Sequence, residues 1–332
     1  MLVLAGDVGG TNARLALVEV AAGRAVLRAR AQVAVAEQAG LEGPVSSFLG
    51  VHLGGAPAPR ACIGVAGTII GRAASVAGVN MPWTVDAEAL ERACGLPRVD
   101  LINDFHAAAR GIELLGPADV LPIGGGEVGR PGEPGHPQAI LGAGTGLGQA
   151  FILPLPDGRR VIVPTEGGHR DFAPRNPLED RLLAWLRGHY GRVSTERVLS
   201  GPGLVSIYRF LVDAEQLPAC EPVEAVAPAE QGPVITAMAG SHPACMIALD
   251  VFVDVYGAEA GNVALTVLAT GGVYLAGGIA PTVLAQPASA TRFRRTFEDK
   301  GRLRGLLETI PVRVITNPDL GLLGAAREAT LA

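Results

Sequence analysis

Asp104 is the residue in this sequence with the clearest capacity for chemistry, because it comes just after the short buried strand that we expect from Val99 to Ile102. A carboxylate at the carboxyl end of a buried strand can orient a bound alcohol and accept its proton, as a general base does. The alternative is structural, since Asn103 or Asp104 could cap the helix that we expect from Phe105 to Leu115. The two roles are compatible.

Two glycine-rich turns could hold phosphate groups. Gly6 to Asn12 has the sequence GDVGGTN, and Gly142 to Gly148 has the sequence GAGTGLG. Glycines let the backbone approach a ligand and present N–H groups to it, which suits phosphate oxygens. Asp7 could also hold a hydrated Mg²⁺ ion, which usually keeps several waters. Each turn alone would favour an ordinary hairpin, but two in one chain favour phosphate binding.

Glu166, His169 and Glu196 could bind hydroxyl groups. A sugar hydroxyl is both a donor and an acceptor, and carboxylates and an imidazole can satisfy it in pairs. A lone glutamate or histidine is more often structural, and the spacing of these three does not show whether they meet in space. Gly277 and Gly278 follow a short apolar strand and would let a flat ring lie close to the backbone. On their own they favour a simple turn at the end of a strand.

The elements that hold these residues show an internal repeat. We expect one hairpin from residues 2–6 and 13–20 and a second from 139–141 and 149–153. Each closes on a glycine-rich turn, which suggests two related lobes with a ligand between them. Further strands are expected at 25–35, 60–66, 99–102, 273–276 and 312–315, and helices at 85–94, 105–115, 177–189, 198–212, 244–268 and from about 320.

The composition indicates a folded chain with more than one core. The 332 residues exceed what one hydrophobic core usually supports, and 48% are hydrophobic. A net charge of −5 without a basic run disfavours nucleic-acid binding. The four cysteines form no C-x-x-C pair, so we expect reduced cytosolic thiols and no zinc site. No signal peptide is apparent, and glycine pairs and Pro281 interrupt the uncharged stretch from Gly261 to Gln286, so we expect no membrane helix.

Taken together, these motifs resemble the bacterial glucokinase family, which belongs to the superfamily of hexokinase, actin and heat-shock ATPases. The motifs occur in the family's order over nearly the whole chain, and the ordered set is highly specific. The chain lacks the cysteine-rich zinc motif of the other large group of bacterial sugar kinases. The matching segments are 7–15 (DVGGTNARL), 80–83 (NMPW), 102–105 (INDF), 144–148 (GTGLG), 166–174 (EGGHRDFAP), 196–204 (ERVLSGPGL) and 277–279 (GGI).

The resemblance implies a role for each candidate residue. Asp104 is similar to the family's base for the 6-hydroxyl group of glucose. The implied sugar ligands are Asn103, Asp104, Glu166, His169 and Glu196, the implied phosphate loops contain Gly9, Gly10, Thr11, Asn12 and Thr145, and the implied adenosine turn contains Gly277 and Gly278. Asp7 remains a candidate for Mg²⁺, bound through water.

The resemblance also implies a fold and a cellular setting. The expected fold is α/β, a two-lobed actin-like (ribonuclease H-like) ATPase with a cleft between the lobes. We expect a small lobe from residues 1–115 and 312–332 and a large lobe from 116–311. The implied protein is a cytoplasmic homodimer that uses ATP and Mg²⁺ to phosphorylate glucose, the first step of glycolysis, with no nucleic-acid or membrane partner.

Two alternatives remain open. The chain could phosphorylate another hexose or use polyphosphate as the donor, which only assays with several sugars and donors can decide. It could also be a catalytically silent sugar sensor, but the presence of Asp104 disfavours this hypothesis. The loop from Gly124 to Pro137 has no counterpart in the resemblance, and the sequence does not indicate its role.

Overall fold

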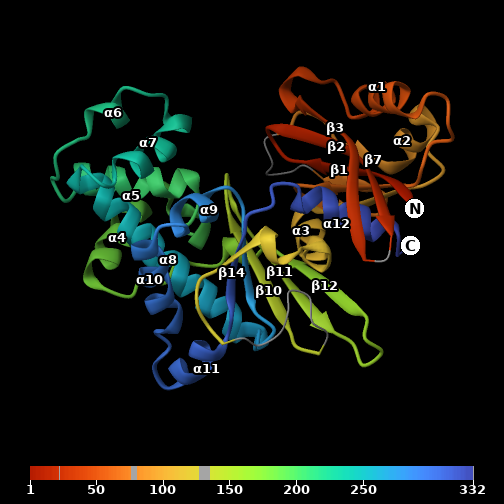
Figure 1. Cartoon of the computed structure of the whole chain (residues 1–332). Helices are drawn as coiled ribbons and strands as arrows, with labels where there is room; N and C mark the ends of the chain where they lie inside the picture. The colour runs from red at the N-terminus through yellow and green to blue at the C-terminus, as the bar shows by residue number, and fades with distance from the viewer. Residues whose placement is uncertain (22, 76–80, 127–134, 332) are drawn as a thin grey trace. The chain divides into compact units, whose positions relative to one another are not determined.

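The computed structural model of this protein describes residues 1–21, 23–75, 81–126 and 135–331. The chain divides into two compact units, whose elements are labelled in Figure 1. The first unit contains Met1–Asp119, Val161–Pro164 and Asn317–Ala332, and the second contains Val120–Arg160 and Thr165–Thr316.

The first unit contains a five-stranded sheet with the strand order β3-β2-β1-β4-β8. β1 is antiparallel to β2 and β2 to β3, whereas β4 is parallel to β1 and β8 is parallel to β4. Tight turns can join only the antiparallel strands, so the parallel strands are reached by longer crossovers. The strands are β1 (Leu2–Val8), β2 (Asn12–Ala21), β3 (Arg24–Ala34), β4 (Ala61–Val65) and β8 (Val99–Asn103).

Apolar side chains pack on both faces of this sheet, because successive side chains of a strand point to opposite faces. Val3 and Ala5 of β1 pack with the C-terminal helix α12, while Leu4 packs in the cluster that contains α1 and α2. The helices of the unit are α1 (Glu42–Leu53), α2 (Ala87–Cys94), α3 (Asp104–Gly111) and α12 (Leu320–Ala329), and a small second sheet contains β5 (Thr68–Ile70), β6 (Ala73–Ser75) and β7 (Val85–Asp86).

The second unit repeats this topology. Its sheet belongs to the second unit apart from residues 161–164 of β12, which are grouped with the first unit. The strand order is β12-β11-β10-β13-β14-β9, in which β10 is antiparallel to β11 and parallel to β13, and β13 is parallel to β14. The first five positions match those of the other sheet, and β9 adds an antiparallel edge strand. The strands are β9 (Val120–Pro122), β10 (Gln138–Ala143), β11 (Leu147–Pro154), β12 (Arg160–Thr165), β13 (Val273–Ala276) and β14 (Val312–Ile315).

The second unit is rich in helices, and the long helix α8 lies at the centre of its core. α8 packs against α5, α7 and α10, and most of its residues are buried. The helices are α4 (Pro177–Tyr190), α5 (Gly201–Asp213), α6 (Glu221–Glu224), α7 (Gln231–Met238), α8 (Pro243–Val267), α9 (Ile279–Leu284), α10 (Pro287–Glu298) and α11 (Arg304–Thr309).

Within the described ranges, no single helix is long and apolar enough to cross a bilayer. One pair of helices, bent by 96°, passes that test by length and composition: Pro228–Met238 together with Pro243–Val267.

The expected fold class and internal repeat are confirmed by two sheets of the same strand order. The unit boundaries differ from the expected ones, because β14 pairs with β13 and so places residues 312–316 in the second unit. Residues 116–119 lie in the first unit. Residues 127–134 of the loop from Gly124 to Pro137, and the motif residue Asn80, lie outside the described part of the chain.

Candidate active site

The first glycine turn, residues 9–11, joins β1 to β2. Gly9 N–H donates a hydrogen bond to Asn12 O at 3.0 Å and so closes the turn. Thr11 and Asn12 are exposed, and Gly9 and Gly10 are half-buried. The turn therefore presents backbone and side-chain donors to solvent, as the binding of phosphate oxygens requires.

Asp7 lies at the start of this turn, and its carboxylate forms an ion pair with Arg14 on β2. The two residues lie directly opposite each other in the ladder, and Arg14 Nη1 also donates to Pro318 O at 2.7 Å. A Cβ atom on Gly321 would lie 2.8 Å from Asp7 Oδ2, so the glycine leaves room for the carboxylate. Because Arg14 offsets its charge, Asp7 is better suited to accept a hydrogen bond from a cation's water than to coordinate the cation directly.

Asp104 is the first residue of α3 and directly follows β8. Asn103 Oδ1 caps this helix by accepting hydrogen bonds from the N–H groups of Phe105 at 2.9 Å and His106 at 3.2 Å. Asn103 Nδ2 donates to Gly67 O at 3.1 Å. The capping role that the sequence left open is thus real for Asn103, and it fixes the backbone that carries Asp104. Gly67 O uses one N–H of the Asn103 amide, and the second N–H has no hydrogen-bond partner shown among the described residues.

The carboxyl ends of three parallel strands lie level in the first unit. Val8 of β1 is in register with Val65 of β4, and Val65 is in register with Asn103 of β8. Neighbouring strands are ~4.8 Å apart, so the first glycine turn and Asp104 lie at one edge of the sheet, roughly 10 Å apart.

The second glycine turn, residues 144–146, joins β10 to β11 in the second unit. It is closed by a hydrogen bond from Gly144 N–H to Gly146 O at 2.8 Å. Glu196 Oε2 accepts a hydrogen bond from Leu147 N–H at 2.8 Å, at the end of the turn. Thr145 is exposed at the tip. One of the predicted sugar ligands therefore fastens the predicted phosphate turn.

Glu166, His169 and Glu196 lie close together in the second unit. His169 Nε2 is 3.9 Å from a carboxylate oxygen of Glu166, and His169 Nδ1 is 3.9 Å from Glu196 Oε1. Both distances exceed hydrogen-bonding range, so the imidazole lies between two carboxylates without being tied to either. The side chains of Glu166 and His169 are 72% and 58% exposed, so their polar atoms are open to a ligand.

Backbone pairing brings these three residues together. Asp171 forms an isolated β-bridge with Ser194, and Thr195 N–H donates to Arg170 O at 2.8 Å. These bonds hold the segment after His169 beside the segment before Glu196. The proximity therefore depends on a pairing that sequence spacing does not reveal.

The buried carboxylate of Glu259 supports the turn from Glu166 to His169 through the neighbouring side chains. Glu259 of α8 is only 6% exposed, accepts a hydrogen bond from Gln149 Nε2 at 2.8 Å and forms an ion pair with Arg170. A Cβ atom on Gly167 would lie 2.2 Å from Gln149 Oε1, so the turn packs directly on this network. A buried charge is costly unless it is paired, so Arg170 and Glu259 hold each other in place.

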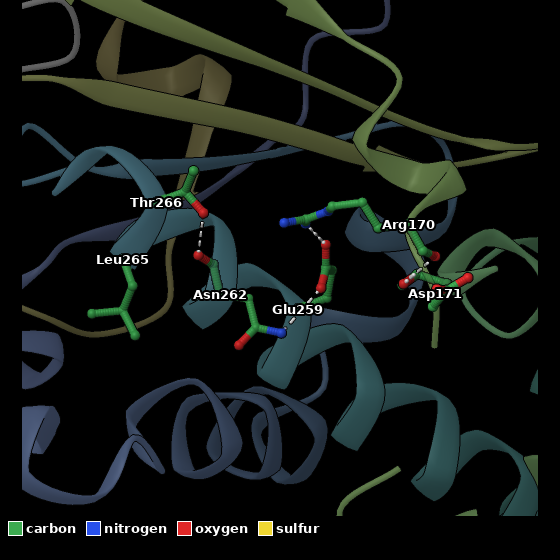
Figure 2. A pocket seen from close by; sticks show the side chains of 7 residues that line it. Arg170, Asp171, Glu259, Asn262, Leu265 and Thr266 are labelled. Carbon is green, nitrogen blue, oxygen red and sulfur yellow. Dashed lines mark hydrogen bonds and ion pairs between the residues drawn. The ribbon is translucent and has the colours of Figure 1, made fainter. Parts of the chain in front are cut away.

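A polar cavity of about 370 Å³ lies beside this network in the second unit. Figure 2 shows the Arg170 side chain reaching toward Glu259, with Asn262 on the next turn of α8. The residues that line the cavity are Arg170, Asp171, Thr195, Glu259, Asn262, Leu265 and Thr266.

Gly277 and Gly278 follow β13 and are exposed. Gly277 has a φ of +85°, and a Cβ atom on it would lie 2.5 Å from Ala143 O. Any other residue would be strained there and would collide with β10. β10 and β13 are adjacent parallel strands, so this turn and the second glycine turn lie at the same edge of the second sheet.

An ion-pair cluster fastens α3 to α12 within the first unit. Arg110 Nε donates to Glu328 Oε2 at 2.6 Å, and His106 Nε2 lies 3.4 Å from the same oxygen. Burial by itself raises the pKa of Glu328, but His106 and the Arg110 guanidinium outweigh it and hold this pKa below its usual value. The helix that begins at Asp104 is therefore anchored by charge as well as by its cap.

The predicted residues thus form two groups, one in each unit. Asp7, Gly9 to Asn12, Asn103 and Asp104 lie at the carboxyl edge of the first sheet. Thr145, Glu166, His169, Glu196, Gly277 and Gly278 belong to the second unit. The sequence analysis missed the supporting residues Gln149, Arg170 and Glu259. A signal was present for Glu259, because a lone carboxylate inside an apolar helix needs a partner.

Relatives of known function cover nearly the whole chain. The sequence model of the family described as Glucokinase matches residues 4–332. A glucokinase of Yersinia pestis (strain Pestoides F) is 43% identical over 323 residues, covering 97% of this chain and 94% of that protein.

Solved structures show the same likeness. The crystal structure of a glucokinase from an Antarctic psychrotroph has a TM-score of 0.83 and 27% identity, covering 100% of this chain and 99% of that one. A glucokinase of the ROK family from Streptomyces griseus has the same fold, with a TM-score of 0.67 and 22% identity, covering 100% of both chains. The chain belongs to the glucokinase family, whose members transfer the γ-phosphoryl group of ATP to the 6-hydroxyl group of glucose.

Proposed function

We propose that Asp104 is the general base with which this chain phosphorylates the 6-hydroxyl group of glucose. The observation that carries the proposal is the position of Asp104 at the carboxyl end of β8, on a helix start fixed by the Asn103 cap. Its carboxylate would accept the hydroxyl proton while the sugar oxygen bonds to the γ-phosphorus of ATP and ADP departs. A general base typically contributes about 10²–10⁴-fold to turnover.

The variant Asp104→Asn tests this role. The amide keeps the shape of the side chain but cannot accept the proton, so we expect kcat to fall by about 10²–10⁴-fold. Glucose binding, followed by calorimetry, should persist. Asp100→Asn is the matched control, because Asp100 is also half-buried on β8 but precedes the carboxyl end of the strand. Near-normal kcat in Asp104→Asn would exclude the assignment.

We also propose that Asn103, Glu166, His169 and Glu196 bind the sugar together with Asp104. Glu166 and Glu196 support this role because each has a carboxylate oxygen 3.9 Å from the imidazole of His169, and the side chains of Glu166 and His169 are mostly exposed. A site built to bond hydroxyl groups discriminates against analogues that lack them, because its own polar groups then remain unpaired. Glu166→Gln should therefore raise the glucose KM and reduce selectivity across a panel of hexoses.

For the nucleotide, we propose that the two glycine turns bind the phosphates and that Gly277 and Gly278 receive the adenosine. The exposed donors of Gly9 to Asn12 and of Thr145 support this role, as does the absence of a side chain at Gly277. The Streptomyces griseus glucokinase is described in complex with glucose and AMPPNP, which is consistent with these two ligands.

Mg²⁺ is part of the same proposal. The ion would neutralise charge on the β- and γ-phosphates. Asp7 fits a water-mediated contact to it, because Arg14 already pairs with one carboxylate oxygen. Asp7→Asn should raise the Mg²⁺ concentration that gives half-maximal activity, with a smaller effect on the glucose KM.

We also propose, from the resemblance to the glucokinase family, that the chain forms a cytoplasmic homodimer. Light scattering coupled to gel filtration should give twice the mass of a 34.0 kDa chain. A single-chain mass at assay concentrations would contradict the dimer. Fractionation of the source cells would test the location.

A further inference from the structure

Two cysteines and a histidine that are far apart in the sequence meet in the second unit. The ligand atoms of Cys220, His242 and Cys245 all lie within 4.8 Å of one another. Cys220 directly precedes α6, His242 directly precedes α8, and Cys245 lies in the first turn of α8. We expected no zinc site because no two cysteines lie close together in the sequence. In the fold, Cys220 meets His242 and Cys245, although more than 20 positions in the sequence separate it from them.

The donor set suits a soft divalent cation. Two thiolates and an imidazole are ligands that Zn²⁺ prefers, at about 2.3 Å for sulfur and 2.0–2.1 Å for nitrogen. In a tetrahedral site such ligand atoms are roughly 3.5–3.8 Å apart. Since no pair of these ligand atoms is more than 4.8 Å apart, binding requires each pair to close by about 1.3 Å at most, which side-chain rotation can supply.

The three side chains face one another, and the thiols of Cys220 and Cys245 interact directly. Cys220 and Cys245 are free cysteines and are buried, at 1% and 0% exposed. His242 Nδ1 is buried and has no hydrogen-bond partner among the described residues. A buried imidazole nitrogen without a partner is unfavourable, and a metal ion would satisfy it.

Hydrogen bonds from the backbone N–H groups of Cys220 and His242 hold these two ligand residues in place. Cys220 N–H donates to Tyr208 Oη at 2.7 Å, and Tyr208 in turn donates to Glu224 Oε1 at 3.0 Å. His242 N–H donates to Met238 O at 2.9 Å, which fixes the start of α8. A site with positioned ligands loses little conformational entropy when the metal binds.

We propose that Cys220, His242 and Cys245 bind one Zn²⁺ ion, with water as the fourth ligand. Water is the usual further ligand where a protein supplies three, and His242 is the one half-buried residue of the group. No predicted ligand of glucose or nucleotide is part of the site, so its role is structural: the ion would tie the segment before α6 to the start of α8. Zn²⁺ should therefore raise the thermal stability of the protein and leave kcat at saturating substrates unchanged.

The test measures zinc uptake by the full-length protein. Protein treated with a chelator and a thiol reductant is titrated with Zn²⁺ against a chromophoric competitor. We expect one tight site per chain in the wild type and in Cys94→Ser, whose half-buried cysteine lies in the first unit. Each of three ligand substitutions should weaken zinc binding strongly: Cys220→Ser, Cys245→Ser and His242→Asn. Loss of a residue that only hydrogen-bonds to a metal ligand typically weakens metal binding by about 10–100-fold, and loss of a ligand itself should have a larger effect.

Two further measurements keep the test decisive if a buried variant misfolds. Co²⁺ added to the reduced wild type should give the visible absorption of a tetrahedral site with thiolate ligands. Cys220→Ala and Cys245→Ala, which add no polar group to the core, should bind neither metal while keeping the circular dichroism of the wild type. Kinase activity, measured in parallel, reports on the proposed active site independently.

Three outcomes would overturn the proposal. One is zinc uptake by the wild type no greater than that of the cysteine variants. Another is uptake that survives in all three ligand variants, since the ion would then bind elsewhere. The third is a disulfide between Cys220 and Cys245 in the freshly purified protein, identified by peptide mapping together with a count of two reactive thiols instead of four after denaturation.

Discussion

Glu196 links the sugar group to the second phosphate turn, and substitutions should separate its two functions. Glu196 Oε2 accepts the hydrogen bond from Leu147 N–H at 2.8 Å, while Oε1 faces His169. Glu196→Gln keeps an acceptor for Leu147 but removes the charge beside the imidazole. Glu196→Ala removes both interactions. The two variants should therefore differ in ATP binding and resemble each other in glucose binding.

The magnitude follows from the lost hydrogen bond. A bond from an N–H group to a carboxylate contributes about 1.5–3 kcal/mol. If the whole of that free energy is lost from ATP binding, because the turn is no longer held in place, the ATP KM of Glu196→Ala should rise by about 10–150-fold. This range is an upper limit. The ATP KM of Glu196→Gln should stay close to that of the wild type. The glucose KM should rise in both variants.

Steady-state kinetics with each substrate varied in turn, the other being saturating, measure both constants. Glu166 provides the control pair, because its side chain is 72% exposed and it belongs to the same cluster around His169. Glu166→Gln and Glu166→Ala should raise the glucose KM and leave the ATP KM unchanged. Equal ATP KM values for Glu196→Ala and Glu196→Gln would refute the argument that this carboxylate holds the turn.

Three other outcomes are expected. Glu259→Gln should raise the glucose KM with little change in kcat, because it weakens the ion pair with Arg170 that supports the turn from Glu166 to His169. Equal losses of kcat and of glucose affinity would contradict this positioning role. Chelation of Mg²⁺ by EDTA should abolish turnover without changing the circular dichroism of zinc-free protein, since the ion acts on the phosphates. The lowered pKa of Glu328 means that its ion pairs stabilise the fold above the unfolded-state pKa of about 4.3 and are lost as pH falls through the lower folded-state value. The difference in unfolding free energy between the wild type and Glu328→Gln should therefore be largest near pH 7 and shrink below about pH 4, as measured by urea denaturation; a difference that does not change with pH would contradict this.

Local pattern alone predicted the two hairpins and most of the long strands of the two main sheets. The glycine turn between residues 2–6 and 13–20 predicts a hairpin because a tight turn can join only antiparallel strands, and the second hairpin repeats the signal. The apolar runs at 61–65 and 273–276 are buried strands, as expected from their lack of alternation. Asp104 could be predicted as a candidate general base from local sequence as well, since its position depends only on the strand before it and the helix after it.

Tertiary structure decided the features that depend on contacts distant in sequence. β14 lies in the second unit because it pairs with β13, and residues 312–315 carry no local signal of that choice. The cluster of Glu166, His169 and Glu196 exists because the bridge between Asp171 and Ser194 joins two loops.

The same dependence explains the supporting network and the cysteine group. Glu259 meets Arg170 across 89 residues, and Cys220 meets Cys245 only through the packing of the segments around α6 and α8. The sequence by itself specified which residues could do chemistry and the strands that carry them. Which of those residues act together was decided by the fold, because hydrogen bonds and ion pairs form only between groups within about 3–4 Å, whatever their separation along the chain.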